Sequence, residues 1–318
     1  MKRVLFSVAT AALLGAGLVM PTGGAVSAGS AGETARATEG RDLRWDPSTL
    51  TRRESAALEA SQQRVLQRSG LTVGQRANGS VSIPVDFHGV TDRQGHGYVS
   101  KARIHRQIKV LNRAYAGLTG PAAANTPFRF HLNSVSRTKN REWYTASYFE
   151  KKGRASLREM QRTLHVGNHR HLNLFSVGPN FGLLGYANYP SPNVNKLDGV
   201  VIWGASMPGG NGNLGPGSVY NRGDTATHEV GHWLNIRHTF EGSCGARNDL
   251  VTDTPRQFAG DNIFEEDVSL DTCGNPGGPR DPVRNFMNYT DDPFMNQFTR
   301  GQRERMNTAW FIRLALDR

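Results

Sequence analysis

The apolar positions along the chain predict several strands. Apolar and polar residues alternate over residues 81–87 and 128–132, which is the pattern of half-buried strands. Two compact, mainly apolar runs, at residues 172–177 and 199–203, have the length of short strands. These four segments predict a sheet in the first two thirds of the chain.

Helical patterns lie between and around these strands. Ser100 is a capping residue that opens a helix with one apolar face, and Gly117 follows at its end. Capping boxes predict two more helices, beginning near Ser156 and Thr299, and residues 53–68 also have a helical pattern. The order strand–helix–strand–helix–strand–strand predicts an α+β fold in which helices cover a mixed sheet.

The N-terminal 28 residues have the layout of a secretory signal peptide. Lys2 and Arg3 precede an uncharged apolar run at residues 4–20, and small residues lead to a cleavage site after Ala28. A membrane anchor is the alternative, but the run is short for a span and no basic stop follows it. We therefore expect a secreted, extracellular protein that keeps no stable membrane anchor after signal removal.

The next residues differ from the rest of the chain in composition. Residues 29–79 are charged and weakly apolar, which predicts a pro-segment or a flexible N-terminal tail. The folded domain is expected over residues 80–318.

Overall composition narrows the class of protein. Hydrophobic residues make up 37% of the 318 positions, which excludes a wholly disordered chain and, with no further long apolar run, a polytopic membrane protein. The net charge is +11, but acidic residues are interspersed, so we interpret the charge as a basic surface. Nucleic acid is not an expected partner.

The candidate chemistry lies at residues 228–238. His228 and His232 are one helical turn apart, so both project from one face and can share a metal ion, and the intervening Glu229 can reach a water on that metal. His238 can join them only if the chain leaves the helix, and Asn235 tolerates the left-handed conformation that ends one. The spacing predicts a zinc site with three histidine ligands.

Two alternatives compete with this interpretation. A zincin whose third ligand is a downstream glutamate could use Glu265 or Glu266, but His238 makes that ligand unnecessary. The chain could also be a secreted binding module that keeps the fold of such an enzyme but has no catalytic activity. The intact motif argues against it, because a silent relative usually loses at least one of the reactive residues.

Beyond this motif the sequence resembles the metzincin zinc endopeptidases, and within them the pappalysin group with its bacterial secreted members. The resemblance covers residues 80–318 and rests on the histidine motif, on the stretch from His238 to Cys244, and on residues 249–255, 285–292 and 298–306. It implies a mixed twisted sheet and an active-site helix above a loop-rich C-terminal subdomain that ends in a helix. The upper subdomain would span about residues 80–235 and the lower about 236–318.

The resemblance also implies roles for single residues. His228, His232 and His238 become the zinc ligands, and Glu229 becomes the general base and acid. Met287 becomes the hydrophobic floor beneath the zinc, and Tyr289 a phenol that contacts the metal or the tetrahedral intermediate. The implied function is a secreted zinc endopeptidase that hydrolyses peptide bonds in proteins.

The sequence departs from the family pattern in two places that matter here. Asn235 stands where most members have Gly, which its left-handed tolerance allows. Family pro-segments can hold latency through a cysteine thiolate on the zinc, but residues 29–79 contain no cysteine. An inhibitory segment would need a carboxylate, such as Asp42 or Asp46, or steric cover alone, and the sequence leaves these choices open.

Two structural elements are expected in the lower subdomain. Cys244 and Cys273 are the only cysteines, and in a secreted chain one disulfide is the economical interpretation, with two free thiols as the alternative. Acidic residues crowd the same region, a composition that suits structural Ca²⁺, and relatives in the family use this ion. Asp253 and Thr254 are the first candidates for its ligands, and solvated carboxylates are the alternative.

The last expectation concerns specificity. The S1′ pocket of a metzincin is bounded by the Met-turn, which is the segment around Met287, and by the residues just after it. Asp291 and Asp292 are adjacent in that stretch. A carboxylate in that pocket, for which Asp292 is the candidate, would favour Arg or Lys at P1′. This preference also predicts self-processing before Arg52 or Arg53. Alternatively, both carboxylates bind backbone N–H groups and leave an apolar pocket.

Overall fold

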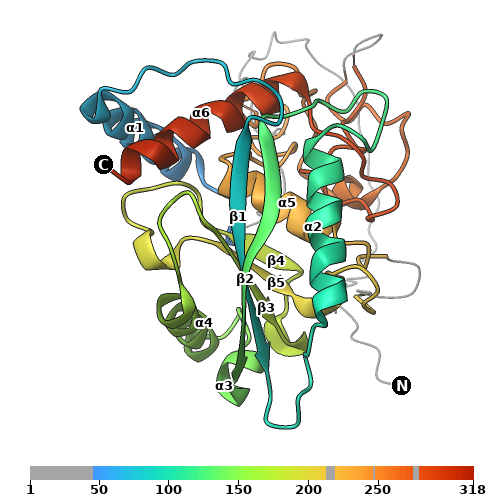
Figure 1. The fold of residues 1–318 in the computed structure, drawn as a ribbon. Coiled ribbons are helices and arrows are strands. Elements are labelled where there is room, and N and C mark those ends of the chain that lie inside the picture. Colours follow the sequence, from blue (N-terminus) through green and yellow to red (C-terminus); the bar gives the residue numbers. More distant parts are fainter. Residues whose placement is uncertain (1–45, 213–218, 246–247, 275–278) are drawn as a thin grey trace, which may run out of the picture. The chain divides into compact units, whose positions relative to one another are not determined.

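The computed structural model describes residues 46–212, 219–245, 248–274 and 279–318 (Figure 1). The expected signal peptide and Asp42 lie outside the described residues. Within the described part of the chain, none of the helices has the length and apolar character that a membrane span requires. The main elements are α1 (Arg52–Ser69), β1 (Val81–Thr91), α2 (Lys101–Tyr115), β2 (Phe128–Lys139), α3 (Arg141–Tyr144), α4 (Lys151–Leu164), β3 (Leu172–Val177), β4 (Gly185–Ala187), β5 (Val200–Trp203), α5 (Asp224–Trp233) and α6 (Arg300–Leu316).

The five strands form one mixed sheet in the order β2-β1-β3-β5-β4. The first four of these are mutually parallel, and β4 runs antiparallel to β5 at the edge of the sheet. The mixed α+β fold that the sequence predicts is confirmed. The edge position of β4 leaves one side of its backbone available to another extended chain.

The two faces of the sheet pack against different helices. Successive residues of a strand point to opposite faces, so Leu174 and Ile202 join one cluster, with apolar residues of α2, α5 and α6. Phe175 and Val201 join a second cluster with residues of α3 and α4. Helix α5, which carries the histidine motif, is thus held against the sheet by a buried apolar core.

Helix α1 belongs to the segment in which the sequence predicted a pro-segment or flexible tail. Thr51 opens the helix with a capping box, and α1 packs beside α6 (Figure 1). The Gln62 amide nitrogen donates to the Asn235 side-chain oxygen (3.1 Å) and to the Pro190 carbonyl (2.8 Å). The described residues from 46 to 79 are therefore folded against the domain, and the expected boundary at residue 79 marks no structural break.

Residues between α5 and α6 contain little regular secondary structure, as expected for a loop-rich lower subdomain. The Cys244–Cys273 disulfide is present. A covalent link across a loop of this length stabilises the fold by roughly 3–4 kcal/mol, because it restricts the unfolded chain. Thr299 opens α6 with the predicted capping box.

Candidate active site

Helix α5 is fixed at both ends. At its start, one oxygen of Asp292 accepts hydrogen bonds from the backbone N–H groups of Arg222 (2.7 Å), Gly223 (3.1 Å) and Asp224 (3.4 Å). At its end, Asn235 has φ of 67°, and the N–H of Ile236 donates back to the Gly231 carbonyl. The predicted left-handed exit at Asn235 is confirmed, and it turns the chain back so that His238 reaches the helix.

The three histidines of the motif converge. Their Nε2 atoms lie 3.1 Å apart for His228 and His232, 3.0 Å for His232 and His238, and 3.1 Å for His228 and His238. The Nδ1 atoms of His228 and His232 lie 2.7 Å from the backbone carbonyls of Phe286 and Ile236. All three side chains are buried.

This arrangement fits a zinc ion. Because carbonyls only accept hydrogen bonds, the Nδ1 atoms facing them carry the protons, and the Nε2 atoms of His228 and His232 expose lone pairs. Burial, followed by the charge of a neighbouring histidine, lowers the pKa of His228 to about 3, so this ring is neutral. Neutral imidazole nitrogens about 2.0–2.1 Å from a shared centre are the usual ligands of Zn²⁺. Among the described residues, this is the one group of three or more potential ligands close enough to hold a metal.

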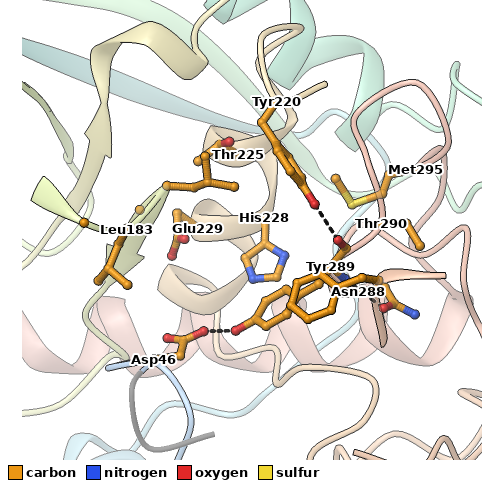
Figure 2. A pocket seen from close by; sticks show the side chains of 14 residues that line it. Asp46, Leu183, Tyr220, Thr225, His228, Glu229, Asn288, Tyr289, Thr290 and Met295 are labelled. Carbon is orange, nitrogen blue, oxygen red and sulfur yellow. Dashed lines mark hydrogen bonds between the residues drawn. The ribbon is translucent and has the colours of Figure 1, made fainter. Parts of the chain in front are cut away.

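Glu229 lines a pocket beside the triad formed by His228, His232 and His238 (Figure 2). Its Oε2 atom is buried and has no hydrogen-bond partner among the described residues. Burial, and then the nearby Asp46 carboxylate, raise the pKa of Glu229 well above its usual value. A Cβ at Gly185 would lie 2.7 Å from the Glu229 Cγ, so glycine on β4 gives this side chain its space.

Met287 and Tyr289 come to the triad from the loop before α6. Met287 is fully buried, and its sulfur packs against Gly231 in the middle of α5. The Tyr289 hydroxyl lies 3.2 Å from the His238 Nε2. The structure therefore places both residues beside the histidines, where the family resemblance expects them.

The segment before α1 also reaches the triad. A carboxylate oxygen of Asp46 lies 3.2 Å from the His238 Nε2 and accepts a hydrogen bond from the Tyr289 hydroxyl (Figure 2). Asp46 is 9% exposed. The sequence suggested Asp42 and Asp46 as carboxylates for latency. Of these two, Asp46 is described by the structure, and it lies beside His238.

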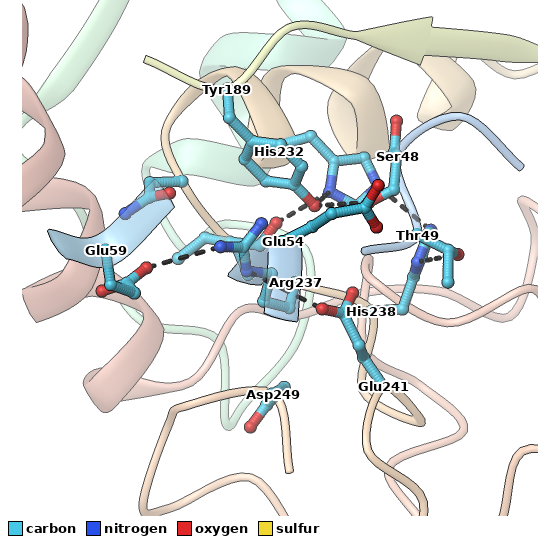
Figure 3. Close-up of polar contacts among 12 residues, drawn as sticks. Ser48, Thr49, Glu54, Glu59, Tyr189, His232, Arg237, His238, Glu241 and Asp249 are labelled. Atoms are coloured by element: carbon cyan, nitrogen blue, oxygen red, sulfur yellow. Dashed lines mark hydrogen bonds and ion pairs between the residues drawn. The ribbon is translucent and has the colours of Figure 1, made fainter. Parts of the chain in front are cut away.

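The sequence analysis did not identify Tyr189, Arg237 or Glu59, which form a chain of contacts that ends at His232. The Tyr189 hydroxyl lies 3.1 Å from the His232 Nδ1, and the Arg237 guanidinium lies 4.2 Å from the centre of the Tyr189 ring (Figure 3). Arg237 is fully buried and lies 3.4 Å from Glu59 of α1. No motif spacing links these residues, because their contacts join distant parts of the chain.

The calcium candidates are only partly supported by their positions. Both Asp253 oxygens are engaged at the start of α6, one by the Thr299 hydroxyl (2.7 Å) and the other by the Gly301 N–H (2.8 Å). Asp249 and Thr254 differ, because both are buried, they interact with each other, and each has a side-chain oxygen without a hydrogen bond to the other described residues. Burial raises the pKa of Asp249 to about 8.

The specificity candidates contact backbone groups. Asp291 accepts a hydrogen bond from the Val219 N–H (2.7 Å), and Asp292 caps α5 through one oxygen. The other Asp292 oxygen is buried without a partner in the described part of the chain. Glu265 and Glu266 are exposed and lie outside the group of histidines that could hold a metal.

Comparison with known proteins identifies similar sequences. The family model described as pregnancy-associated plasma protein-A matches residues 182–310, a range that contains the histidine motif and the Met-turn. An extracellular metalloprotease of Colletotrichum graminicola is 40% identical over 238 residues, which cover 72% of this chain and 77% of that protein. Extracellular metalloprotease 1 of Coccidioides posadasii is 35% identical over 260 residues, covering 79% of this chain and 84% of that protein.

Solved structures give similar matches. A promirolysin mutant of Tannerella forsythia matches with a TM-score of 0.60 at 27% identity, covering 84% of this chain and 94% of that chain. Mature mirolysin of Tannerella forsythia in complex with a cleaved peptide matches with a TM-score of 0.55 at 30% identity, covering 76% and 98%.

Proposed function

The chain belongs to the pregnancy-associated plasma protein-A family of metalloproteases, the pappalysin group of the metzincins, and from this premise we propose how its site cleaves proteins and which residues it prefers to cleave before. As a member, it is a secreted zinc endopeptidase acting on proteins or peptides. The observation that carries the residue assignments is the convergence of three histidine Nε2 atoms beside Glu229 in one pocket.

We assign His228, His232 and His238 as the zinc ligands. Zinc, when bound, polarises the scissile carbonyl and acidifies a water molecule. Glu229 accepts the proton of the attacking water on its unpartnered Oε2 and passes it to the leaving amine. A raised carboxyl pKa suits both halves of this transfer. The Tyr289 hydroxyl, next to His238, is placed to donate a hydrogen bond to the developing oxyanion.

The substrate is proposed to bind as an extended strand along β4. This strand is the edge of the sheet, and Gly185 on it packs against Glu229. Main-chain pairing of a peptide with an open edge supplies affinity that does not depend on sequence, and pockets for alternate side chains supply specificity. Leu183 and Leu184, just before β4, line the same pocket as Glu229.

For the P1′ residue we propose a preference for Arg or Lys, read by Asp292. The pocket beside Glu229 is bordered by Tyr220, Thr225 and Met295, and Thr225 follows directly on the N–H groups that Asp292 caps. The unpartnered second oxygen of Asp292 leaves it an acceptor for a guanidinium or ammonium group. The alternative is an apolar pocket, in which Asp292 serves α5 alone.

Peptide-library cleavage tests this preference. Wild-type enzyme is expected to enrich Arg or Lys immediately after the cut, and Asp292→Asn is expected to reduce the preference for Arg over Leu about ten- to hundredfold, because a hydrogen bond between charged groups contributes about 1.5–3 kcal/mol. Asn keeps an oxygen for the α5 cap. Asp291→Asn is the matched control and should keep the preference. A preference for Leu or Phe that neither substitution alters would refute the proposed role of Asp292.

For calcium we propose Asp249 and Thr254 as ligands instead of Asp253. Their buried oxygens, which lack a hydrogen bond to the other described residues, are the donors that Ca²⁺ prefers, whereas both Asp253 oxygens already hold the start of α6. A buried polar atom left unpaired costs about 1–3 kcal/mol, which a bound cation would offset.

Thermal unfolding at fixed zinc concentration tests the calcium proposal. A hundredfold excess of Ca²⁺ over its Kd is expected to stabilise the wild-type protein by about 2.7 kcal/mol. Asp249→Asn should abolish this calcium-dependent rise in Tm, and Asp253→Asn should retain it. A wild-type Tm that does not respond to calcium, in protein first treated to remove the ion, would contradict the proposal.

A further inference from the structure

One exposed aromatic side chain lies in the wall of the proposed P1′ pocket. Eight large apolar side chains are exposed among the described residues, and Phe264, at 48%, is the one of these eight that lines the pocket beside Glu229. We propose that Phe264 packs against the side chain that enters this pocket, so that the enzyme selects substrates with a long side chain at P1′. This inference deepens the proposed function and rests on it, because it assumes that the pocket receives a substrate residue.

The residue before Phe264 anchors the segment that carries it. The short 3₁₀-helix Asp261–Phe264 lies in the loop between α5 and α6. Ile263 is fully buried in a small apolar cluster that includes Phe240, and Tyr289 packs against this cluster. The same turn of chain therefore buries Ile263 and leaves Phe264 at the pocket, so a packed core sets the position of the exposed ring.

Polar contacts and the disulfide hold the loop on both sides of this 3₁₀-helix. Before it, the Gln257 side-chain oxygen accepts hydrogen bonds from the Thr239 hydroxyl (3.0 Å) and the Asn288 amide nitrogen (2.9 Å). After it, the Cys244–Cys273 disulfide ties the loop back to the segment that follows α5. The pocket wall is thus formed before a substrate arrives, and little conformational entropy is lost when a side chain packs on it.

Neighbouring aromatic rings connect Phe264 to the candidate metal site. The centre of the Phe264 ring lies 5.6 Å from the centre of the Tyr289 ring, at an interplanar angle of 31°. The centre of the Tyr289 ring lies 5.0 Å from that of His238, one of the proposed zinc ligands. A substrate side chain that packs on Phe264 is therefore close to the metal, as expected for a residue next to the cleaved bond.

The chemistry of the pocket lining indicates which side chains it accepts. Leu183, Leu184 and Met295 line the same pocket as Phe264. A substrate side chain of several carbons removes apolar surface of these residues from water, whereas the single methyl group of alanine covers little of it. Arg and Lys also have apolar stems, so contact with Phe264 is compatible with a charge that Asp292 recognises. Phe264 would then select for length, and Asp292 for charge.

Three fluorogenic peptides that differ only in having Arg, Leu or Ala at P1′ test this role with the secreted, zinc-loaded enzyme. Phe264→Ala is expected to lower kcat/KM about five- to twentyfold for the Arg and Leu peptides, mainly through a higher KM, because apolar contact is lost in both the bound and the transition state. The Ala peptide should be cleaved as by the wild type, since its side chain covers little of the ring. Phe264→Tyr keeps the ring and should retain the wild-type preference.

Val268→Ala is the matched control. Val268 is carried by the same loop and is 51% exposed, but it does not line the pocket, so all three peptides should be cleaved as by the wild type. Asp292→Asn distinguishes the two specificity proposals, because it should affect the Arg peptide alone, whereas Phe264→Ala should affect the Leu peptide as well.

An equal loss for all three peptides in Phe264→Ala would overturn the proposal, because the residue would then only maintain the loop. Unchanged cleavage of the Arg and Leu peptides, or an equal effect of Val268→Ala, would overturn it too. With an active wild-type enzyme, each of these results refutes the role of Phe264 and leaves the proposed function intact. Absence of cleavage of every peptide by the zinc-loaded wild type refutes the proposed function, and the role of Phe264 with it.

Discussion

Glu229→Gln is expected to lower peptidase turnover about a hundred- to ten-thousandfold while zinc content stays at one ion per chain, since a positioned general base contributes this much to proton transfer. In the proposed site the three histidines hold the metal without help from Glu229, whose side chain lines the pocket (Figure 2). Gln has the same shape, so it fits the space that Gly185 leaves, but its amide accepts no proton at neutral pH.

Zinc content by mass spectrometry and turnover on a fluorogenic peptide measure the two quantities separately. Glu265→Gln is the matched control: the side chain is exposed, so both quantities should stay at the wild-type level. Loss of zinc in Glu265→Gln would support a glutamate third ligand in place of His238. Turnover above a few per cent of wild type in Glu229→Gln, with intact zinc, would remove the assigned role.

The sequence predicted the site best where the chemistry depends on local spacing. His228 and His232 share a helical turn, and Asn235 provides the left-handed exit that brings in His238, so each step follows from backbone geometry. The sheet was equally predictable, because alternating patterns and apolar runs in the sequence indicate directly which residues are buried. Both depend on residues close together in the chain.

Element boundaries were less predictable. The capping box at Ser156 placed the start of a helix there, but α4 begins at Lys151, and the buried Ser156 hydroxyl donates to Glu142. A serine followed three residues later by glutamate fits a helix start and a helix interior alike. Only the contact with α3 distinguishes the two.

Long-range polar contacts could not be predicted from the sequence. The sequence could not show that Asp253, a calcium candidate, and Asp292, the candidate for P1′ recognition, each cap a helix distant in the sequence, α6 and α5 respectively. Helix α1 has a weak apolar face and is anchored chiefly through Glu59 and Gln62, so composition suggested a tail. A carboxylate's partner is set by tertiary structure, whereas an apolar face is visible in the sequence.

Arg313 of α6 contacts the end of the active-site helix, α5. The fully buried guanidinium donates to both oxygens of the fully buried Asp198 (2.7 and 3.2 Å) and to the Trp233 carbonyl at the end of α5 (3.1 and 2.7 Å). It also lies 3.5 Å from the centre of the Trp233 ring. One side chain therefore joins α6, the loop before β5 and the last turn of α5.

Arg313→Met is expected to lower the free energy of unfolding by about 3–5 kcal/mol, because it leaves the Asp198 carboxylate buried without its main counter-charge.

The matched control is Arg300→Met on the same helix. Arg300 is 86% exposed and its pair with Glu304 is worth little, so the expected change is within about 0.5 kcal/mol. Adding Asp198→Leu to Arg313→Met should restore part of the loss, since no buried charge then remains unpaired. Urea unfolding of the Glu229→Gln protein at fixed zinc measures all three. A double variant at least as unstable as Arg313→Met alone would show that the loss comes from the contacts with Trp233 and not from the stranded carboxylate.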